Sequence, residues 1–276
     1  KFNKNEKVIR YLCETFKDTI DINTCNNDGN TASIFAVQTK DLTIIKYLCD
    51  IYKDRIDISK RTDRNGNTAF MLAVLDHNTY KKSYLSLDLI EINKQNKDCQ
   101  SIETMQYLCD KFKDTIDINK QNNDGATVLM LAARYNKNDE VMQYLCETFT
   151  DIIDINKQNS QGNTVFMIAA QCNTNIKVLQ YLYNTFKSAI DINKQNDQGD
   201  TALILAIRYN TNVEVIRYLC NTFKGTIDIN KQNNNGYTTF MLAALNNTKD
   251  EVIQHLCNTF KDTIDITKQD NNGKTE

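Results

Sequence analysis

A regular spacing of glycines is the feature that most constrains how this chain can fold. Gly125, Gly162, Gly199, Gly236 and Gly273 follow one another at equal intervals of 37 residues. Periods between about 20 and 50 residues are typical of solenoids, in which each repeated unit buries its apolar face only against its neighbours. The sequence therefore predicts a stack of similar modules and not a single globular core.

Each of these glycines lies in a short polar turn. The turn sequences include NDG, SQG, DQG and NNG, in which glycine can adopt a positive φ at little cost. Two residues after the glycine, six units carry a threonine: Thr31, Thr68, Thr127, Thr164, Thr201 and Thr238. A threonine side chain can accept a hydrogen bond from a backbone N–H of a first helical turn, so we expect a helix to begin directly after it.

Two helices are predicted in each unit. The first comprises a short apolar stretch such as VLMLAA or ALILAI, which suits a helix packed on both sides. A polar break such as NKND opens the second helix, EVMQYLCETF, in which Val141, Tyr144, Leu145 and Phe149 recur at helical spacing. The segment IDIN then provides a short extended return to the next turn.

This unit resembles the ankyrin repeat. The family pattern Asp-x-x-Gly-x-Thr-Pro-Leu-His-x-Ala-Ala is matched by NNDGATVLMLAA and its copies over essentially the whole chain. Valine, alanine or threonine replaces the family proline, and methionine or isoleucine replaces the family histidine. The threonine–histidine hydrogen bond of the family therefore cannot form, which leaves the threonine with its capping role alone. Tetratricopeptide repeats have a similar period but lack the turn glycine and the extended return.

The resemblance implies an all-α repeat fold, an ankyrin-repeat solenoid of stacked helix–loop–helix units with short β-like turns. The second helix is about one turn longer than in the family. We divide the single array into partial units at 1–20 and 265–276 and units at 21–56, 57–90, 91–116, 117–153, 154–190, 191–227 and 228–264. Because the chain starts in a second helix and ends in a turn, we expect both ends to be cuts through a longer array.

One stretch breaks the period, because 60 residues separate Asp57 from Asp117. Aligning the tripeptide YLS with the YLC of other units makes 57–90 a complete repeat and 91–116 a degenerate repeat that lacks its first helix. The alternative is one repeat with a long loop after its first helix. In either case, we expect residues 77–105 to be the least regular part of the stack.

Charge and hydropathy exclude several classes of partner. The formal net charge is −2 at pH 7, so no broad positive field is present to attract a nucleic-acid backbone. No apolar run approaches the roughly 18–20 residues that span a bilayer. We therefore expect a monomer whose partner is a protein, with neither nucleic acid nor a membrane involved.

Nine cysteines raise the question of disulfides and metal sites. Six of them occupy the last position of YLC or HLC: Cys13, Cys49, Cys109, Cys146, Cys220 and Cys257. They alternate with apolar residues at helical spacing, as small buried residues do. Because Cys25, Cys99 and Cys172 have no CxxC partner, we expect no metal and reduced thiols, as in an intracellular and cytoplasmic protein.

The source of the chain has left a compositional signature. Proline and tryptophan are absent, while asparagine, lysine and isoleucine are abundant. This bias is typical of an AT-rich genome such as that of a giant virus, a protist or an intracellular bacterium. A viral or intracellular-pathogen origin would place the protein in the host cytoplasm.

No catalytic constellation is apparent in the sequence. The two histidines, His77 and His255, have no plausible nucleophile or metal partners. Aspartate pairs such as Asp114 and Asp117 recur in several units, whereas a catalytic pair is expected once. The sequence contains no GxGxxG motif, and the GKT at Gly273 has Lys268 where the phosphate-binding motif GxxxxGKT requires its first glycine. We therefore expect no enzymatic activity, no catalytic residues and no cofactor.

Positions that differ between units are the candidates for function, because shared positions reflect packing. In ankyrin proteins the turn tips and the two residues after the alanine pair face a concave groove and contact partners. The tips are Asn27/Asp28/Asn30, Arg64/Asn65/Asn67, Asn123/Asp124/Ala126, Ser160/Gln161/Asn163, Asp197/Gln198/Asp200 and Asn234/Asn235/Tyr237. The groove pairs are Gln38/Thr39, Leu75/Asp76, Arg134/Tyr135, Gln171/Cys172, Arg208/Tyr209 and Leu245/Asn246.

Arginine and tyrosine often dominate the binding energy of protein interfaces. The predicted partner-binding residues are therefore Arg134, Tyr135, Gln171, Cys172, Arg208, Tyr209, Tyr237, Leu245 and Asn246. Arginine can fork to a carboxylate while tyrosine supplies apolar area, which favours an acidic or mixed protein surface or peptide as the ligand.

The sequence thus predicts a non-catalytic scaffold that binds a partner protein through the groove and the turn tips. Three alternatives stay open. The array could be a structural spacer or spring in which no surface patch matters. The variable positions could be neutral variation on a solvated surface. The segment could also be the recognition part of a larger enzyme whose catalytic domain lies outside this sequence.

Overall fold

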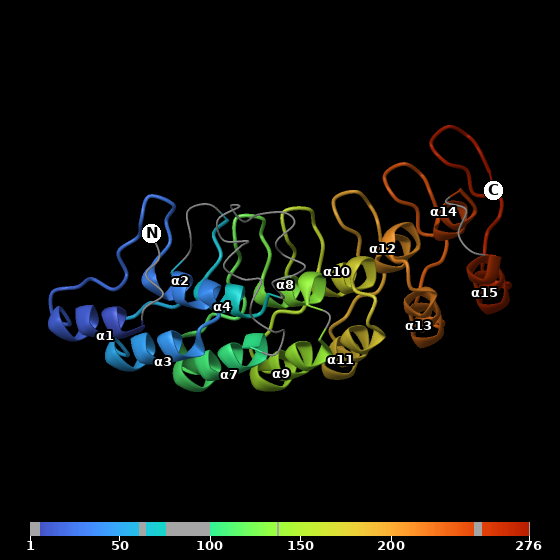
Figure 1. The fold of residues 1–276 in the computed structure, drawn as a ribbon. Coiled ribbons are helices and arrows are strands. Elements are labelled where there is room, and N and C mark those ends of the chain that lie inside the picture. Colours follow the sequence, from blue (N-terminus) through green and yellow to red (C-terminus); the bar gives the residue numbers. More distant parts are fainter. Residues whose placement is uncertain (1–5, 61–64, 76–99, 137, 246–249, 276) are drawn as a thin grey trace. The chain divides into compact units, whose positions relative to one another are not determined.

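The chain folds into two stacks of helix pairs (Figure 1). The computed structural model describes residues 6–60, 65–75, 100–136, 138–245 and 250–275. These residues form α-helices and one 3-10 helix, and no strand occurs among them. The predicted all-α repeat fold is confirmed. The two compact units comprise Lys1–Val128 and Leu129–Glu276.

The described residues of the first unit form two inner helices, each of which directly follows a turn, and three outer helices. Its elements are α1 (Glu6–Thr15), α2 (Ala32–Thr39), α3 (Leu42–Ile51), α4 (Ala69–Ala73), α7 (Gln100–Phe112) and the 3-10 helix η1 (Lys113–Thr115). The inner helices α2 and α4 pack on one another, and the outer helix α3 packs between α1 and α7. The helices therefore stack in two rows.

The second unit repeats the same arrangement four times. Its elements are α8 (Val128–Tyr135), α9 (Asp139–Phe149), α10 (Val165–Cys172), α11 (Ile176–Phe186), α12 (Ala202–Tyr209), α13 (Val213–Phe223), α14 (Thr239–Leu245) and α15 (Asp250–Phe260). Even-numbered helices are the inner ones, and α10 packs on α12 as α12 packs on α14. The outer helices have 11 residues and the inner ones 7 or 8, so the second helix is the longer one.

The inner helices form where the threonines predict them. The Thr201 hydroxyl accepts a hydrogen bond from the backbone N–H of Ile204 at 3.3 Å, which caps α12. Thr164 caps α10 in the same way. All residues from Ala202 to Ile207 are buried, because the inner helices α10 and α14 and the outer helix α13 pack on α12. A helix this short gains its stability from that packing.

The turns lie directly against one another along the stack. Gly199 has a φ of 76°, and its turn is joined to the next by a 3.0 Å hydrogen bond from the backbone N–H of Asn234 to the carbonyl of Gln198. A Cβ added at Gly199 would lie 2.6 Å from the backbone nitrogen of Asn234. Glycine is therefore required here both by the backbone conformation and by the close approach of the next turn.

Asparagine side chains also join neighbouring turns. The side-chain oxygen Oδ1 of Asn196 accepts hydrogen bonds from the backbone N–H groups of Gln198 and Asp200, at 3.0 and 2.9 Å. Its amide donates to the Asn163 side chain of the preceding repeat at 2.8 Å. In the first unit, Asn122 donates to Asn67 at 2.9 Å in the same manner. One asparagine thus closes its own turn and attaches it to the one before.

A second asparagine, in the DIN segment, reaches in the opposite direction along the chain. Asn193 donates to the carbonyl of Thr226 at 2.7 Å and accepts from the backbone N–H of Asp228 at 2.8 Å. Asn230 holds the following repeat with the same pair of bonds. The abundance of asparagine therefore has a structural cause.

Contacts on both sides of the irregular stretch are part of the described structure. In the described residues, α7 packs on α4 as α3 packs on α2. The backbone N–H of Asn123 donates to the carbonyl of Asn65 at 3.0 Å, a bond also formed between other turns. Residues 61–64 and 76–99 of this stretch lie outside the described part of the chain. The division at 57–90 and 91–116 and its single-repeat alternative therefore both stay predictions.

The cysteines of the YLC register are packing residues. Cys13, Cys49, Cys109, Cys146 and Cys220 are buried, Cys257 is half-buried, and all six carry free thiols. Burial raises the pKa of the Cys49, Cys146 and Cys220 thiols to about 12. A thiol with so high a pKa is almost entirely protonated at neutral pH and is a poor nucleophile.

We expect the Cys172 thiol, which is exposed, to react with a thiol reagent in the native protein well before the five buried YLC cysteines. Burial denies the reagent access to those five until the chain opens locally. Time-resolved alkylation followed by peptide mass spectrometry gives the order of reaction. A disulfide between any two of the six YLC-register cysteines, or early labelling of Cys146, would contradict this expectation.

Candidate functional site

The predicted partner-binding residues of the second unit end its inner helices. Arg134 and Tyr135 end α8, Gln171 and Cys172 end α10, Arg208 and Tyr209 end α12, and Leu245 ends α14. We refer to these seven residues as the helix-end row. Arg134 and Cys172 are exposed, as are Tyr209 at 49% and Leu245 at 62%, while the other three are half-buried. Asn246 lies outside the described residues.

Two buried or half-buried asparagines fix the spacing of the helix-end row. Asn173, which follows Cys172, donates to the carbonyls of Ala133 and Asn136 at 2.8 and 3.1 Å. Asn210 follows Tyr209 and donates to the carbonyls of Ala170 and Asn173 at 2.8 and 2.9 Å. The ends of α10 and α12 are therefore each bonded to the end of the preceding inner helix, which holds the ends of α8, α10 and α12 in register.

Both arginines of the row stack on the tyrosine that follows them. The guanidinium of Arg134 lies 5.4 Å from the ring centre of Tyr135, and that of Arg208 lies 5.0 Å from the ring centre of Tyr209. Such cation–π contacts stabilise an exposed pair by roughly 0.5–1 kcal/mol. Each pair therefore presents an aromatic surface and a planar cation side by side.

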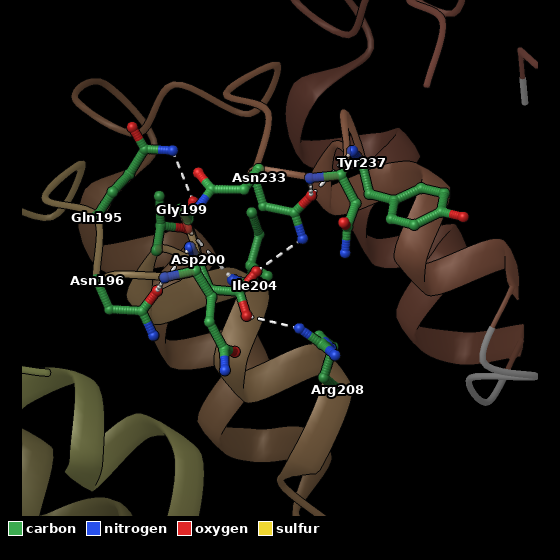
Figure 2. Close-up of polar contacts among 12 residues, drawn as sticks. Gln195, Asn196, Gly199, Asp200, Ile204, Arg208, Asn233 and Tyr237 are labelled. Carbon is green, nitrogen blue, oxygen red and sulfur yellow. Dashed lines mark hydrogen bonds and ion pairs between the residues drawn. The ribbon is translucent and has the colours of Figure 1, made fainter. Parts of the chain in front are cut away.

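Arg208 also forms an ion pair with a buried carboxylate (Figure 2). The Arg208 guanidinium lies 2.6 Å from Oδ2 of Asp200, whose side chain is completely buried. The other carboxylate oxygen of Asp200 accepts a hydrogen bond from the Asn233 amide of the next repeat at 2.8 Å. Both oxygens of Asp200 are thus satisfied, which a buried carboxylate requires.

Arg134 lacks this support. The residue eight positions before it is Ala126, whereas Asp200 lies eight positions before Arg208. No ion pair joins Arg134 to any residue in the described part of the chain. Partial desolvation raises the pKa of the neighbouring Cys172 thiol, and the charge of Arg134 opposes part of that rise. Arg134 is therefore an exposed cation whose charge reaches the next repeat.

The turn tips contain both exposed and buried residues. The first two tip residues of each repeat in the second unit are exposed, including Asp197, Gln198, Asn234 and Asn235. The third is buried in most repeats, at Asn67, Ala126, Asn163 and Asp200. Those four are packing residues and not partner contacts, contrary to the expectation that whole tips face a partner. Tyr237, at the same position, is half-buried, and its ring points away from Asp200 (Figure 2).

Outside the row, the described titratable groups include one histidine with a shifted pKa. His255 lies half-buried on α15, where burial and the charge of Arg217 lower the pKa of its imidazole. Within the described ranges, no group of three or more His, Cys, Asp or Glu side chains could hold a metal ion. His77 and Cys99 lie outside those ranges. No helix in the described residues is long and apolar enough to cross a membrane.

Sequence reasoning missed the residues that organise the row. Asp200 was grouped with the variable tips, although the eight-residue spacing between an aspartate and an arginine was a usable signal. Asn173 and Asn210 follow the variable pairs directly and recur in register with Asn136, which was a second signal. Their bonds reach residues 37 to 40 positions away, so only the stacked structure identifies the partners.

Comparison with known proteins gives a consistent family assignment for the fold. A family model for ankyrin repeats, in three copies, matches residues 1–98, 95–196 and 183–270. The comparison with curated proteins gave no match. Among solved structures, the ankyrin repeat domain of Bcl-3, a member of the IkappaB protein family, is similar with a TM-score of 0.61 and 15% identity, covering 90% of this chain and 93% of that one. An ankyrin repeat protein, EF0377, has a TM-score of 0.60 and 23% identity and covers 87% and 98%.

Proposed function

Because the chain belongs to the ankyrin repeat family, whose members are generally protein-interaction modules, we propose that it is a non-catalytic scaffold that binds a partner protein through the helix-end row. The exposed tip residues of the same repeats and Tyr237 extend this surface. The observation that carries the proposal is the row itself. Exposed Arg134, Cys172, Tyr209 and Leu245 side chains occur at the ends of four successive inner helices, and Asn173 and Asn210 bond three of these helix ends to one another.

The dimensions of the row suit a protein interface. Adjacent layers of packed helices are about 8–10 Å apart, so Tyr135 and Tyr209, two repeats apart, are separated by roughly 20 Å. An interface of standard size buries about 800 Å² on each partner, which is enough to cover both tyrosines at once. Gln171 and Cys172 would lie beneath the middle of such a contact. Exposed Tyr209 and Leu245 supply the apolar area that interface centres contain.

Replacing Tyr135 and Tyr209 by alanine is expected to weaken binding of a partner protein by about 1–2 kcal/mol or more, because truncated aromatic anchors commonly cost this much. The test is affinity capture with the wild-type chain, identification of the captured protein, and titration of that protein against both chains. The midpoint of urea unfolding should change little, because Tyr209 is exposed and Tyr135 is half-buried.

Tyr11 provides a matched control for this experiment. It is 67% exposed on α1 in the first unit and lies outside the helix-end row. The Tyr11→Ala chain should bind like the wild type. If the double variant unfolds easily while binding persists, the two tyrosines are packing residues and the proposal is wrong. Equal binding by all three chains would show that the partner binds outside the helix-end row and would overturn the proposal.

We also place the protein in a reducing, intracellular compartment and expect it to act as a monomer. Buried free cysteines at a helical packing position support a reducing compartment, because an oxidising one favours disulfide-forming cysteine frameworks. The ankyrin fold is generally non-catalytic, which supports a non-catalytic role for this array.

A further inference from the structure

The two arginine–tyrosine pairs of the helix-end row have different electrostatic surroundings, and this difference indicates the chemistry of the partner. We propose that the row binds an extended peptide segment that places an acidic side chain on Arg134 and an apolar side chain on Tyr209 and Leu245. This inference rests on the proposed function, since it specifies the ligand of the same surface.

The charge of Arg208 is already neutralised within the protein. Its guanidinium is paired with the buried Asp200 at 2.6 Å and stacked on Tyr209, so two of its faces are occupied. A ligand carboxylate at Arg208 would have to compete with a buried carboxylate that cannot be left unpaired without a large penalty. Arg208 is therefore a positioning residue that holds the Tyr209 ring, and Tyr209 is the surface offered to a ligand.

Arg134 keeps its capacity to bind an anion. It is exposed, its stacking on Tyr135 occupies one face of the guanidinium, and no described carboxylate pairs with it. The N–H donors of a guanidinium lie in its plane, so stacking leaves them available for a two-point contact with a carboxylate. The Arg134 side chain is already oriented by its stacking on Tyr135, so it loses less conformational entropy on binding a carboxylate than a mobile lysine side chain would.

The row changes in character from one end to the other. It begins at the exposed cation Arg134 on α8, continues through the uncharged Gln171 and Cys172 on α10, and ends with the exposed apolar side chains Tyr209 and Leu245 on α12 and α14. A complementary ligand must therefore be acidic at one end and apolar at the other. An isolated anion would satisfy only the first half of this row.

The spacing of the row sets the length of the ligand. Arg134 and Tyr209 belong to helices two repeats apart, which corresponds to roughly 20 Å. An extended peptide advances about 3.3 Å per residue, so the acidic and apolar side chains should be separated by about six residues. Asn173 and Asn210 bond the three helix ends to one another, so this distance is fixed before binding.

Selection of a displayed library of random twelve-residue peptides against the whole chain tests this ligand. The wild-type chain is expected to enrich peptides that carry Asp or Glu about five to seven residues from an aromatic or aliphatic residue. The Arg134→Gln chain should lose the preference for Asp and Glu while it keeps the apolar preference. For one enriched peptide made synthetically, Arg134→Gln should raise the Kd at least about tenfold, the effect of losing a charged hydrogen bond.

The ligand side of the contact is tested with the same peptide. Replacing its acidic residue by the corresponding amide should weaken binding to the wild-type chain by a similar factor. The same replacement should have little further effect on Arg134→Gln, because the two changes remove one interaction. Circular dichroism should show unchanged unfolding for Arg134→Gln, because the side chain is exposed.

Lys187 is a matched control within the same unit. It is an exposed cation 5.7 Å from the ring centre of Tyr183, at the end of the outer helix α11. Lys187→Gln removes the same charge outside the row and should leave peptide selection unchanged. If Lys187→Gln reduced the preference for Asp and Glu as much as Arg134→Gln does, acidic peptides would be attracted by the overall charge of the protein, and the proposal would be overturned.

The remaining outcomes separate this inference from the proposed function. The ligand inference would be overturned if the peptides selected by the wild-type chain were not enriched in Asp or Glu. It would also be overturned if the Arg134→Gln chain selected the same acidic peptides. A chain that enriches no peptide would overturn it as well. In each of these cases the proposed function still stands if capture of a protein depends on Tyr135 and Tyr209. It fails if capture does not depend on them.

Discussion

Replacing Gly199 by alanine is expected to lower the free energy of unfolding by about 2–5 kcal/mol. A positive φ of 76° costs an L-residue roughly 1–2 kcal/mol in backbone strain. The added Cβ would in addition lie 2.6 Å from the backbone nitrogen of Asn234 and 2.9 Å from the Cα of Asn233. Overpacking of this kind typically costs a further 1–3 kcal/mol, because a backbone cannot move aside as a flexible side chain can.

Two other glycines separate these contributions. Gly273 has the same φ of 76°, but a Cβ there would meet nothing within 4 Å, so Gly273→Ala should cost only the backbone strain. Gly225 has neither a positive φ nor a neighbour within 4 Å, and Gly225→Ala should be close to neutral. Urea unfolding followed by circular dichroism gives all three values. Equal losses at Gly199 and Gly273 would show that the neighbouring turn yields to the Cβ.

The sequence anticipates only part of this effect. The regular spacing and the turn composition predict a glycine in the left-handed region, and seven glycines adopt a positive φ. From strain alone, a substitution should affect its own turn and no other. The stacked structure adds the contact with Asn234, so the damage is expected to reach the next repeat as well.

Replacing Arg208 by glutamine is expected to destabilise the protein by about 2–4 kcal/mol. The change removes the cation from Asp200, whose side chain is completely buried, and leaves that carboxylate with only neutral donors. Breaking one partner of a buried ion pair typically costs about 3–5 kcal/mol, and the partial exposure of Arg208, at 28%, lowers the expected figure. Urea unfolding measures the loss.

The preceding repeat indicates which second substitution should offset the loss of stability in Arg208→Gln. It carries Asn163 and Gln171 at the positions that Asp200 and Arg208 occupy, and Asn163 is buried without any ion pair. The double variant Asp200→Asn with Arg208→Gln recreates this combination and should recover most of the lost stability. If the double variant is as unstable as Arg208→Gln alone, an unpaired buried carboxylate is not the cause of the loss.

The elements inside one repeat could be predicted from the sequence because their causes are local. A threonine next to a short apolar stretch starts an inner helix, and the hydroxyls of Thr164 and Thr201 cap α10 and α12 as expected. The apolar spacing of EVMQYLCETF identifies the outer helix α9, and its cysteine is buried. Each of these features depends on residues within one or two helical turns.

Contacts between repeats could not be predicted in the same way. The bond between the turns at Asn65 and Asn123 joins residues 58 positions apart, and no local pattern in the sequence indicates it. Asp200 looked like an exposed tip residue, but its position against Asn233 of the next turn buries it. The period reveals that units repeat, but it does not show which side of a turn meets its neighbour.

The asparagine bonds have a consequence for how such an array can change length. Asn196 reaches back to the preceding repeat, and Asn193 reaches forward to the following one. Every repeat of this kind therefore contains one asparagine that bonds to the preceding repeat and one that bonds to the following repeat. A duplicated copy can form the same bonds with the repeats on both sides of it. Duplication or loss of a repeat then requires no new contact to evolve. The helix-end pairs take no part in these amide bonds as side chains, so they are free to diverge once a copy is made.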